Sequence, residues 1–444
     1  MEAVYQLAKH ADQLKLLLVA PSNDAADILV ERLAPYFPPS EMRRIIAYSR
    51  TMESVPAPIV KYTRECFDDA DQKKDIISAR IVVATVSYAA RFAYYGIPSG
   101  HFDVLCVDEA GQATEPEVIA VAASSLLNFN RMDHRVGQLI LAGDPKQLGP
   151  IVTSAVGRKF GLHMSYMERL MGRDVYSRGA DGAYPPDLLT KLVCNYRSHP
   201  AIIKLPNQLF YDDELQCCGD KLATHNMTKW EHLPCKGFPV MFHAMEGENL
   251  REARSPSWFN PQEAEQVALY TQMLLDDTRP PLRPEEIGII TPYARQVQKI
   301  QLALKSQGID GIKVGSVECF QGQERRCIIV STVRSEIDEI STDLRFNLGF
   351  VANEKRFNVA ITRAKTLLIV VGSPAVLSLD KENWLPFLKY CHENKSWVGD
   401  DWDPSAVAER TESGDCSDER DWEIMDWPSQ AAEQEAGAFI NREE

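Results

Sequence analysis

The sequence predicts an α/β fold built on doubly wound parallel sheets. The composition is that of a globular protein, with 45% hydrophobic and 25% charged residues. Short apolar runs rich in β-branched residues are typical of strands buried on both faces. Helical stretches separate these runs, and such alternation favours parallel sheets covered by helices. With 444 residues, the chain is long enough for two or three domains that each bury a core.

Nine segments are predicted to be strands. In chain order they are Leu14–Val19, Ile81–Val86, Val104–Val107, Leu139–Ala142, Val240–His243, Ile287–Ile290, Val314–Val317, Cys327–Thr332 and Leu367–Val371. Amphipathic helices are expected in several of the gaps. The clearest helix start has Asn260 as N-cap, Pro261 at the first helical position and Glu263 at the capping-box position.

Two breaks in composition divide the chain. Residues 31–78 lack strand signals and are predicted to form a helical insertion in the first α/β unit. Residues 173–188, which include Pro185 and Pro186, indicate a linker. We therefore expect one domain at 1–172 and a second at 189–398. The segment 399–444 has few aliphatic residues and many acids, which predicts a disordered acidic tail.

Charge and cysteine content restrict the setting in which the protein works. Residues 400–444 hold fifteen Asp and Glu against three Arg, so most of the net charge of −15 lies in the tail. The nearly neutral body does not exclude a polyanionic partner. No apolar run reaches the ~18 residues of a membrane span. No secretory signal follows Met1, and ten scattered cysteines form no CxxC pair, which predicts a reduced, cytoplasmic protein.

Two carboxylates follow the predicted strand Val104–Val107. Asp108 and Glu109 at a strand end form the Walker-B arrangement. Asp108 is the candidate metal ligand and would hold Mg²⁺, usually through water. Glu109 would orient or deprotonate an attacking water. Taken alone, an Asp-Glu pair is more often a strand end with solvated acids.

A second strand ends in Gly143-Asp144-Pro145-Lys146-Gln147. The Gly-Asp-Pro turn would bring Asp144 towards the magnesium shell and point Gln147 at a γ-phosphate. By itself this segment is also compatible with a surface turn that carries a long polar side chain.

The remaining candidates lie in the second half of the chain. Tyr196 offers a ring for base stacking, and Arg197 offers a planar fork for a γ-phosphate. His199 precedes Pro200 and is expected to cap or pack. Gly322 permits close backbone approach to a ligand, and Glu324 would accept hydrogen bonds from ribose hydroxyls. Arg363 is a second candidate phosphate contact. An isolated arginine is usually part of a surface ion pair.

The order of these segments resembles that of the superfamily-one helicases of the nonsense-mediated-decay type, and it looks closest to the Armitage and silencing-defective (Mov-type) RNA helicases. The matching segments are Ala20–Asn23, Ala84–Ser87, Asp108–Gln112, Gly143–Leu148, Asn195–Pro200, Thr291–Tyr293, Gly315–Glu324 and Asn358–Lys365. Pro206–Tyr211 and Phe346–Phe350 favour the Mov-type branch. The resemblance covers about residues 14–397.

The resemblance implies two RecA-like domains of the P-loop NTPase type, with ATP and Mg²⁺ as cofactors. It implies an ATP-dependent RNA helicase that translocates 5′ to 3′ on single-stranded RNA, linked to RNA silencing or mRNA turnover. In this picture Arg197 and Arg363 reach the phosphates across the cleft, and Glu324 meets the ribose. The residues implied to line the RNA track are Pro21, Ser22, Asn23, Thr85, Pro292, Tyr293 and Ser316.

One part of the family pattern is missing. No GxxxxGK[ST] phosphate loop occurs in the 444 residues, and the chain opens with what resembles the helix that follows that loop. We therefore expect the first RecA-like domain to be incomplete. Without the loop no backbone nest holds the phosphates, so the chain as it stands is expected to bind ATP poorly. A truncated gene model or fragment of a complete helicase is the favoured explanation.

Other readings stay open. The chain is alternatively an RNA-binding scaffold without turnover, or a DNA helicase of the same superfamily. The tail carries Trp402, Trp422 and Trp427 among its acids, and tryptophans in such a segment can anchor it in a partner's pocket. The resemblance implies Argonaute-type silencing proteins as that partner. Alternatively, the tail covers the RNA groove, or it only solvates the protein. A zinc site is conceivable where thiols and imidazoles cluster, although their spacing is unusual; the cluster comprises Cys217, Cys218, His225, His232 and Cys235.

Overall fold

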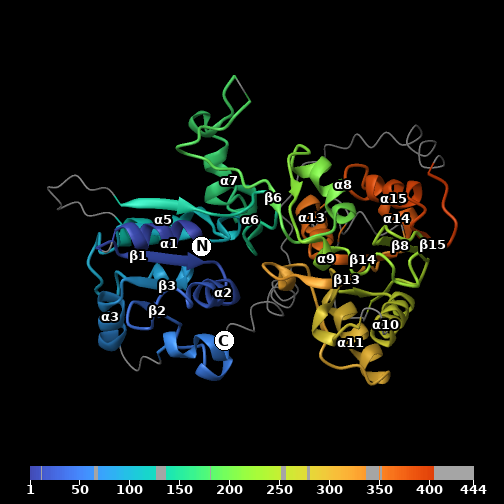
Figure 1. The fold of residues 1–444 in the computed structure, drawn as a ribbon, viewed down its shortest axis with the longest axis horizontal. Helices are drawn as coiled ribbons and strands as arrows, with labels where there is room; N and C mark the ends of the chain where they lie inside the picture. The colour runs from blue at the N-terminus through green and yellow to red at the C-terminus, as the bar shows by residue number, and fades with distance from the viewer. Residues whose placement is uncertain are drawn as a thin grey trace. The chain divides into compact units, whose positions relative to one another are not determined.

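The computed structural model describes residues 1–11, 13–64, 69–126, 137–180, 182–251, 257–277, 281–336, 350 and 353–404. The chain divides into two compact units, with the boundary between Lys191 and Leu192 (Figure 1). The predicted linker 173–188 therefore precedes this boundary, and it contains a 3₁₀ turn at Asp174–Tyr176. The domain limits drawn from the sequence stay predictions. No helix within the described ranges has both the length and the apolarity that crossing a bilayer requires.

Unit 1 contains a five-stranded parallel sheet in the order β2-β3-β1-β4-β5. Its strands are β1 Leu16–Ala20, β2 Met42–Arg44, β3 Ile81–Thr85, β4 Val104–Val107 and β5 Gln138–Leu141. Its helices are α1 Glu2–His10, α2 Asn23–Leu33, α3 Asp69–Ser78, α4 Val86–Ala89, α5 Glu115–Ser125, α6 Ala155–Lys159 and α7 Tyr166–Met171. Short 3₁₀ turns lie at Met52–Ser54, Ala57–Tyr62 and Ala110–Gln112.

Strand β1 shows why this sheet is covered on both faces. All five of its residues are buried, and alternate residues enter different apolar cores. Leu17 and Val19 lie in one core with residues of α4 and α5, whereas Leu16 and Leu18 lie in another with residues of α1 and α2. The near-continuous apolar run that predicted a buried parallel strand is thus explained by helices on each side.

Unit 2 contains a six-stranded parallel sheet in the order β12-β11-β13-β14-β8-β15. Its strands are β8 Val240–Ala244, β11 Ile287–Ile290, β12 Lys313–Gly315, β13 Arg325–Ser331, β14 Ala364–Gly372 and β15 Trp397–Gly399. Two short two-stranded sheets are also present: β6 Cys194–Asn195 pairs with β7 Gln216–Cys217, and β9 Leu250–Arg251 pairs with β10 Trp258–Phe259. The helices are α8 Pro200–Phe210, α9 Lys221–Thr224, α10 Pro261–Asp276, α11 Ala294–Ser306, α13 Glu354–Thr362, α14 Pro374–Leu377 and α15 Trp384–Glu393. Short 3₁₀ turns lie at Pro284–Glu286 and Glu318–Phe320.

The predicted α/β class with parallel sheets is confirmed, and each of the nine predicted strands is present. Two further strands of the large sheets, β2 and β15, were missed, as were the four strands of the short pairs β6–β7 and β9–β10. The expectation that residues 31–78 lack strands is wrong at β2, where Met42-Arg43-Arg44 pairs in parallel with β3. The strand has only three residues and two of them are arginines, so its sequence shows neither an apolar run nor an apolar-polar alternation. Strand β15 was missed because Gly399 and the acids after it read as the start of a tail.

The start of α10 differs from the predicted capping box. Asn260 is the N-cap, and its side chain accepts a hydrogen bond from the Glu263 amide at 3.0 Å. The Glu263 carboxylate does not return to Asn260, because it is fully buried and accepts from the Ser331 hydroxyl at 2.6 Å and the Val333 amide at 2.9 Å. Glu263 therefore connects α10 to the chain that leaves β13.

That connection holds a strained turn. Val333 has φ of 74°, a left-handed conformation that is rare for a β-branched residue. The Arg334 amide donates to the Thr332 carbonyl at 2.9 Å, which closes a γ-turn around Val333. The hydrogen bond from the Val333 amide to Glu263 holds this turn in place, so the buried carboxyl group offsets local strain.

Stability should depend on pH through this glutamate. Burial raises the pKa of Glu263 from 4.5 to about 7, although hydrogen bonds from Ser331 and Val333 oppose the shift. The folded state therefore binds the proton more tightly than the unfolded state, and the free energy of unfolding should fall by roughly 3 kcal/mol as pH rises from 4.5 to 7. Glu263→Gln should remove this loss of stability, as measured by urea denaturation at several pH values. Glu265→Gln on the exposed face of α10 is the control, and equal pH profiles for the two variants would contradict the prediction.

Candidate functional site

The first group of candidate residues lies at one edge of the unit 1 sheet. Because β1, β3, β4 and β5 are parallel, their carboxyl ends meet at the same edge. Pro21 follows β1, Thr85 ends β3, and Asp108 follows β4. Asp144 and Gln147 follow β5 in the next loop. The structure therefore brings the predicted metal and phosphate residues of unit 1 to the edge that also carries Ser22 and Asn23.

The loops after β4 and β5 are in direct contact. The Ala110 amide donates to the Ala142 carbonyl at 2.8 Å. A Cβ on Gly111 would lie 2.8 Å from the Asp144 carbonyl oxygen, and a Cβ on Gly143 would lie 2.8 Å from the Ala110 nitrogen. Only glycine permits this approach at both positions. The two motifs that the sequence predicted separately therefore form one continuous surface.

The carboxylates at this edge have distinct surroundings. Burial raises the pKa of Asp108, since water solvates its charge poorly there. Glu109 has φ of 50° in the left-handed region, a strained position for a side chain. Asp144 accepts hydrogen bonds from the Gln147 amide group at 2.9 Å and the Lys146 backbone at 2.9 Å. Oxygen ligands in partly buried positions suit a hydrated Mg²⁺, whose positive charge would favour the ionised form of Asp108.

Asn23, a predicted RNA contact, is held by two arginines. Its side-chain oxygen accepts from Arg44 at 2.9 Å and from Arg50 at 3.2 Å. Both arginines also pair with Asp27, at 2.9 Å and 2.6 Å, and Arg44 is completely buried. Ser22 caps α2 by accepting from the Ala25 amide at 3.2 Å. Sequence reasoning missed these arginines, because no motif or spacing links β2 to the start of α2.

In unit 2 the candidate residues separate to opposite edges of the sheet. Thr291–Tyr293 and Ser316 follow the carboxyl ends of β11 and β12. Glu324 and Arg363 precede the amino ends of β13 and β14. The residue after Arg197 ties it to the same amino edge, because the Ser198 side-chain hydroxyl donates to the Ala364 carbonyl at 2.7 Å. The predicted RNA residues and nucleotide residues of unit 2 thus occupy different ends of the strands.

Arg197 and Glu324 are brought into direct contact. The Arg197 guanidinium donates to one Glu324 oxygen, and Lys365 lies 2.7 Å from the other. Burial alone would raise the pKa of Glu324, but hydrogen bonds and charge from Lys365 and Arg197 lower it to about 2. Sequence reasoning did not single out Lys365. Its position two residues after Arg363, within the same motif, was the available signal.

The other candidates vary in exposure. Tyr196 is 71% exposed, as a ring that stacks on a base requires. Gly322 has φ of 69°, which requires glycine-like freedom. His199 caps α8 by accepting from the Ala201 amide at 3.1 Å, as expected. Arg363 and Tyr293 are each 1% exposed. Tyr293 packs with Trp258 and Val333, so the structure holds its ring inside a cluster and not at an open surface.

No group of three or more His, Cys, Asp or Glu side chains converges as a metal site within the part of the chain that the structure describes. The zinc site conceived around Cys217 and Cys235 is therefore not formed there. Cys217 and Cys218 are both exposed thiols.

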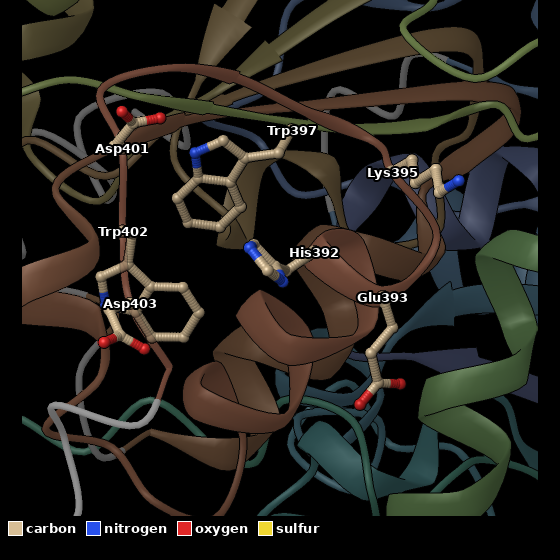
Figure 2. A pocket seen from close by; sticks show the side chains of 7 residues that line it. All are labelled: His392, Glu393, Lys395, Trp397, Asp401, Trp402 and Asp403. Carbon is tan, nitrogen blue, oxygen red and sulfur yellow. The ribbon is translucent and has the colours of Figure 1, made fainter.

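A hollow of about 760 Å³ lies at the end of α15, and none of the predicted catalytic, cofactor-binding or RNA-binding residues lines it (Figure 2). It is lined by His392, Glu393, Lys395, Trp397, Asp401, Trp402 and Asp403. Trp402 stacks on Trp397 with ring centroids 5.3 Å apart and planes inclined by 10°. The expectation that Trp402 belongs to a disordered tail is therefore wrong, because an edge-strand indole gives it a packing partner. Trp422 and Trp427 lie outside the described residues.

Comparisons with known proteins identify relatives along most of the chain. Two family models, each described as an AAA domain, match residues 59–155 and 162–375. The putative helicase mov-10-B.1 of Danio rerio is 44% identical over 90% of this chain, RNA helicase Mov10l1 of Homo sapiens 44% over 91%, and the probable RNA helicase armi of Drosophila melanogaster 34% over 94%. The chain covers 40%, 33% and 37% of the lengths of these relatives. An arterivirus nonstructural protein 10 helicase solved with DNA aligns with a TM-score of 0.40 at 12% identity, over 85% of this chain and 60% of that one.

The two family matches identify an α/β protein of the AAA class, and the parallel sheets agree with this. Within that class, the chain belongs to the superfamily-one helicase family that contains Mov10, Mov10l1 and Armitage, as its homologues show. The predicted family resemblance is confirmed. Helicases of this family use nucleotide and Mg²⁺ in general.

Proposed function

We propose that the chain is the motor part of an ATP-dependent RNA helicase that acts on single-stranded RNA. The observation that carries the proposal is the joined surface of the β4 and β5 loops, where Asp108, Glu109, Asp144 and Gln147 share one strand edge. The identity to proteins named RNA helicases supports the choice of RNA. Because the chain covers two fifths or less of these relatives, its own activity has to be measured.

Each candidate residue for nucleotide binding and hydrolysis has a proposed task. Asp108 and Asp144 would hold Mg²⁺, which supplies neutralising charge for the phosphates when bound. Glu109 would accept the proton of the attacking water, and Gln147 would orient that water or the γ-phosphate. Arg197, with Arg363 as the second finger, would stabilise charge that develops on the transferred phosphoryl group.

The RNA track is proposed along Pro21, Ser22, Asn23 and Thr85 of unit 1, with Pro292, Tyr293 and Ser316 of unit 2. Ser22 and Asn23 use their side-chain oxygens within the protein. Their backbone amides and the Asn23 amide nitrogen are the donors that would meet phosphate. Contacts of this kind grip the backbone and read little sequence. Tyr293 would contribute through its backbone, since its ring is buried.

Phosphate release from ATP, measured with and without single-stranded RNA, tests the proposal. Because the 444 residues hold no GxxxxGK[ST] phosphate loop, we expect this release to be weak, to rise with RNA and to require Mg²⁺. RNA binding without any release would favour the scaffold reading, and equal stimulation by DNA of the same sequence would favour a DNA helicase, because 2′-hydroxyl contacts distinguish the two polymers.

We further propose that the chain works in the cytoplasm and that its acidic tail docks to Argonaute-type silencing proteins. The fifteen acidic residues of 400–444 and their tryptophans support a docking segment. Removal of residues 405–444 should abolish capture of a purified Argonaute while leaving the stacked Trp402 and the RNA affinity intact. Unchanged capture would contradict the docking role, and tighter RNA binding would indicate that the tail shields the RNA groove.

A further inference from the structure

Two cations converge on a single carboxylate at the amino edge of the unit 2 sheet. Glu324 receives Arg197 on one oxygen and Lys365 on the other, the latter at 2.7 Å. The side chains of Arg197, Glu324 and Lys365 are 31%, 35% and 37% exposed, so all three reach solvent. One negative charge cannot neutralise two positive charges, and the cluster of these three side chains carries a surplus of one positive charge.

The backbone holds this cluster together. The His199 amide donates to the Lys365 carbonyl at 2.8 Å, and the Arg325 amide donates to the Arg363 carbonyl at 3.1 Å. The segments that carry Arg197, Glu324 and Lys365 are thereby fixed against each other at the start of β14. The charged groups of the three side chains can therefore exchange partners while the backbone that carries them stays in place.

The chemistry of the cluster favours a phosphate as its external ligand. A guanidinium presents a planar fork, and an ammonium on a flexible stem is a compact point charge, so together they can surround phosphate oxygens from two sides. Tyr196, the residue before Arg197, is 71% exposed beside them and can take a base. A neutral sugar would leave the surplus charge uncompensated, and a carboxylate, which has two oxygens, would contact the two cations less fully than a phosphate with three or four.

We propose that Lys365 joins Arg197 in binding phosphate, and that Glu324 is the internal counter-ion of these two cations, which a bound phosphate displaces. This inference rests on the proposed use of nucleotides and deepens it. Glu324 then has two opposite effects. It favours a nucleoside by accepting hydrogen bonds from ribose hydroxyls, and it competes with phosphate for the two cations.

Binding by the full chain of three probes, inorganic tripolyphosphate, adenosine and ATP, separates these effects. Lys365→Met should weaken tripolyphosphate and ATP binding about tenfold, the usual scale for loss of a charged hydrogen bond, and leave adenosine unchanged. Lys365→Arg should retain most of the affinity. Lys389→Met on the exposed surface of α15 is the matched control and should change none of the three.

Glu324→Gln provides the sharper test, because the expected signs are opposite. It should tighten tripolyphosphate binding by releasing two cations and weaken adenosine binding by losing an acceptor. A purely structural role for Glu324 would weaken both. The tightening should shrink as salt rises, because the released charges are partly exposed.

The results distinguish this inference from the proposed function. If ATP binds but Lys365→Met binds tripolyphosphate and ATP as the wild type does, the phosphate site is wrong and the nucleotide function stands. A second outcome is that tripolyphosphate binds with the expected variant effects, adenosine does not bind, and ATP binds no more tightly than tripolyphosphate. In that case the phosphate site stands and the nucleotide function is wrong. Weaker tripolyphosphate binding by Glu324→Gln would overturn the counter-ion role.

Discussion

Replacement of Glu109 by glutamine is expected to lower RNA-stimulated phosphate release by about 10²–10⁴-fold, the range typical of losing a general base. Glutamine keeps the size of the side chain and removes its ability to accept a proton. Glu109 is the second residue after β4, and its φ of 50° shows that the chain turns there and no longer continues as a strand. Its neighbour Asp108 would still hold Mg²⁺, so binding of RNA and nucleotide should persist.

A matched control comes from the same unit. Glu31 is an exposed carboxylate on α2, and Glu31→Gln should leave the rate unchanged. Phosphate release by the Glu109 variant within a few-fold of the wild type would contradict the assigned role. The measurement is a steady-state phosphate assay at saturating RNA, with RNA affinity measured in parallel.

Replacement of Trp384 by alanine is expected to lower the free energy of unfolding of unit 2 by about 3–5 kcal/mol, the usual cost of truncating a buried aromatic. Trp384 is fully buried at the start of α15. Its ring lies 4.8 Å from Phe357 and 5.7 Å from both Phe350 and Phe387, in edge-on geometries. Its indole nitrogen donates to the Phe350 carbonyl at 3.2 Å, so alanine also removes one of the two hydrogen bonds to this carbonyl, the other coming from the Asn353 amide at 3.5 Å.

Urea denaturation followed by near-UV circular dichroism measures this loss. Trp384→Phe should cost less than alanine, because it keeps most of the apolar volume and loses the hydrogen bond. Trp402→Ala, which removes a partly exposed indole from the same unit, should change stability much less. An equal loss for the Trp384 and Trp402 alanine variants would contradict the role given to the buried cluster.

The α/β class and the nine main strands could be predicted because buried parallel strands are apolar on both faces. The edge strands β2 and β15 could not be predicted in this way. Strand β2 has two arginines, one of which is buried only because Asp27 and Asn23, seventeen or more positions earlier, pair with it. Glu263 shows the same limit, since its sequence position predicts a local cap and its carboxyl instead serves Ser331 and Val333. Pairings between distant segments leave no periodic signal.

For the candidate site, strand ends were the informative feature. A motif that follows a parallel strand must lie at the carboxyl edge, which is why Asp108 and Asp144 could be expected near each other. Sequence position did not tell which side chains are already engaged. The pairing of Arg197 with Glu324 and the burial of Tyr293 depend on contacts across the fold.

The glycine contacts between the β4 and β5 loops have a mechanical consequence. Gly111 and Gly143 bring the two backbones so close that neither loop can shift past the other without a clash. A displacement that starts at the acid pair is therefore transmitted at once to the loop that carries Gln147. We therefore expect the acid pair Asp108-Glu109 and Gln147 to move together, so that a ligand bound at one of them would shift the other.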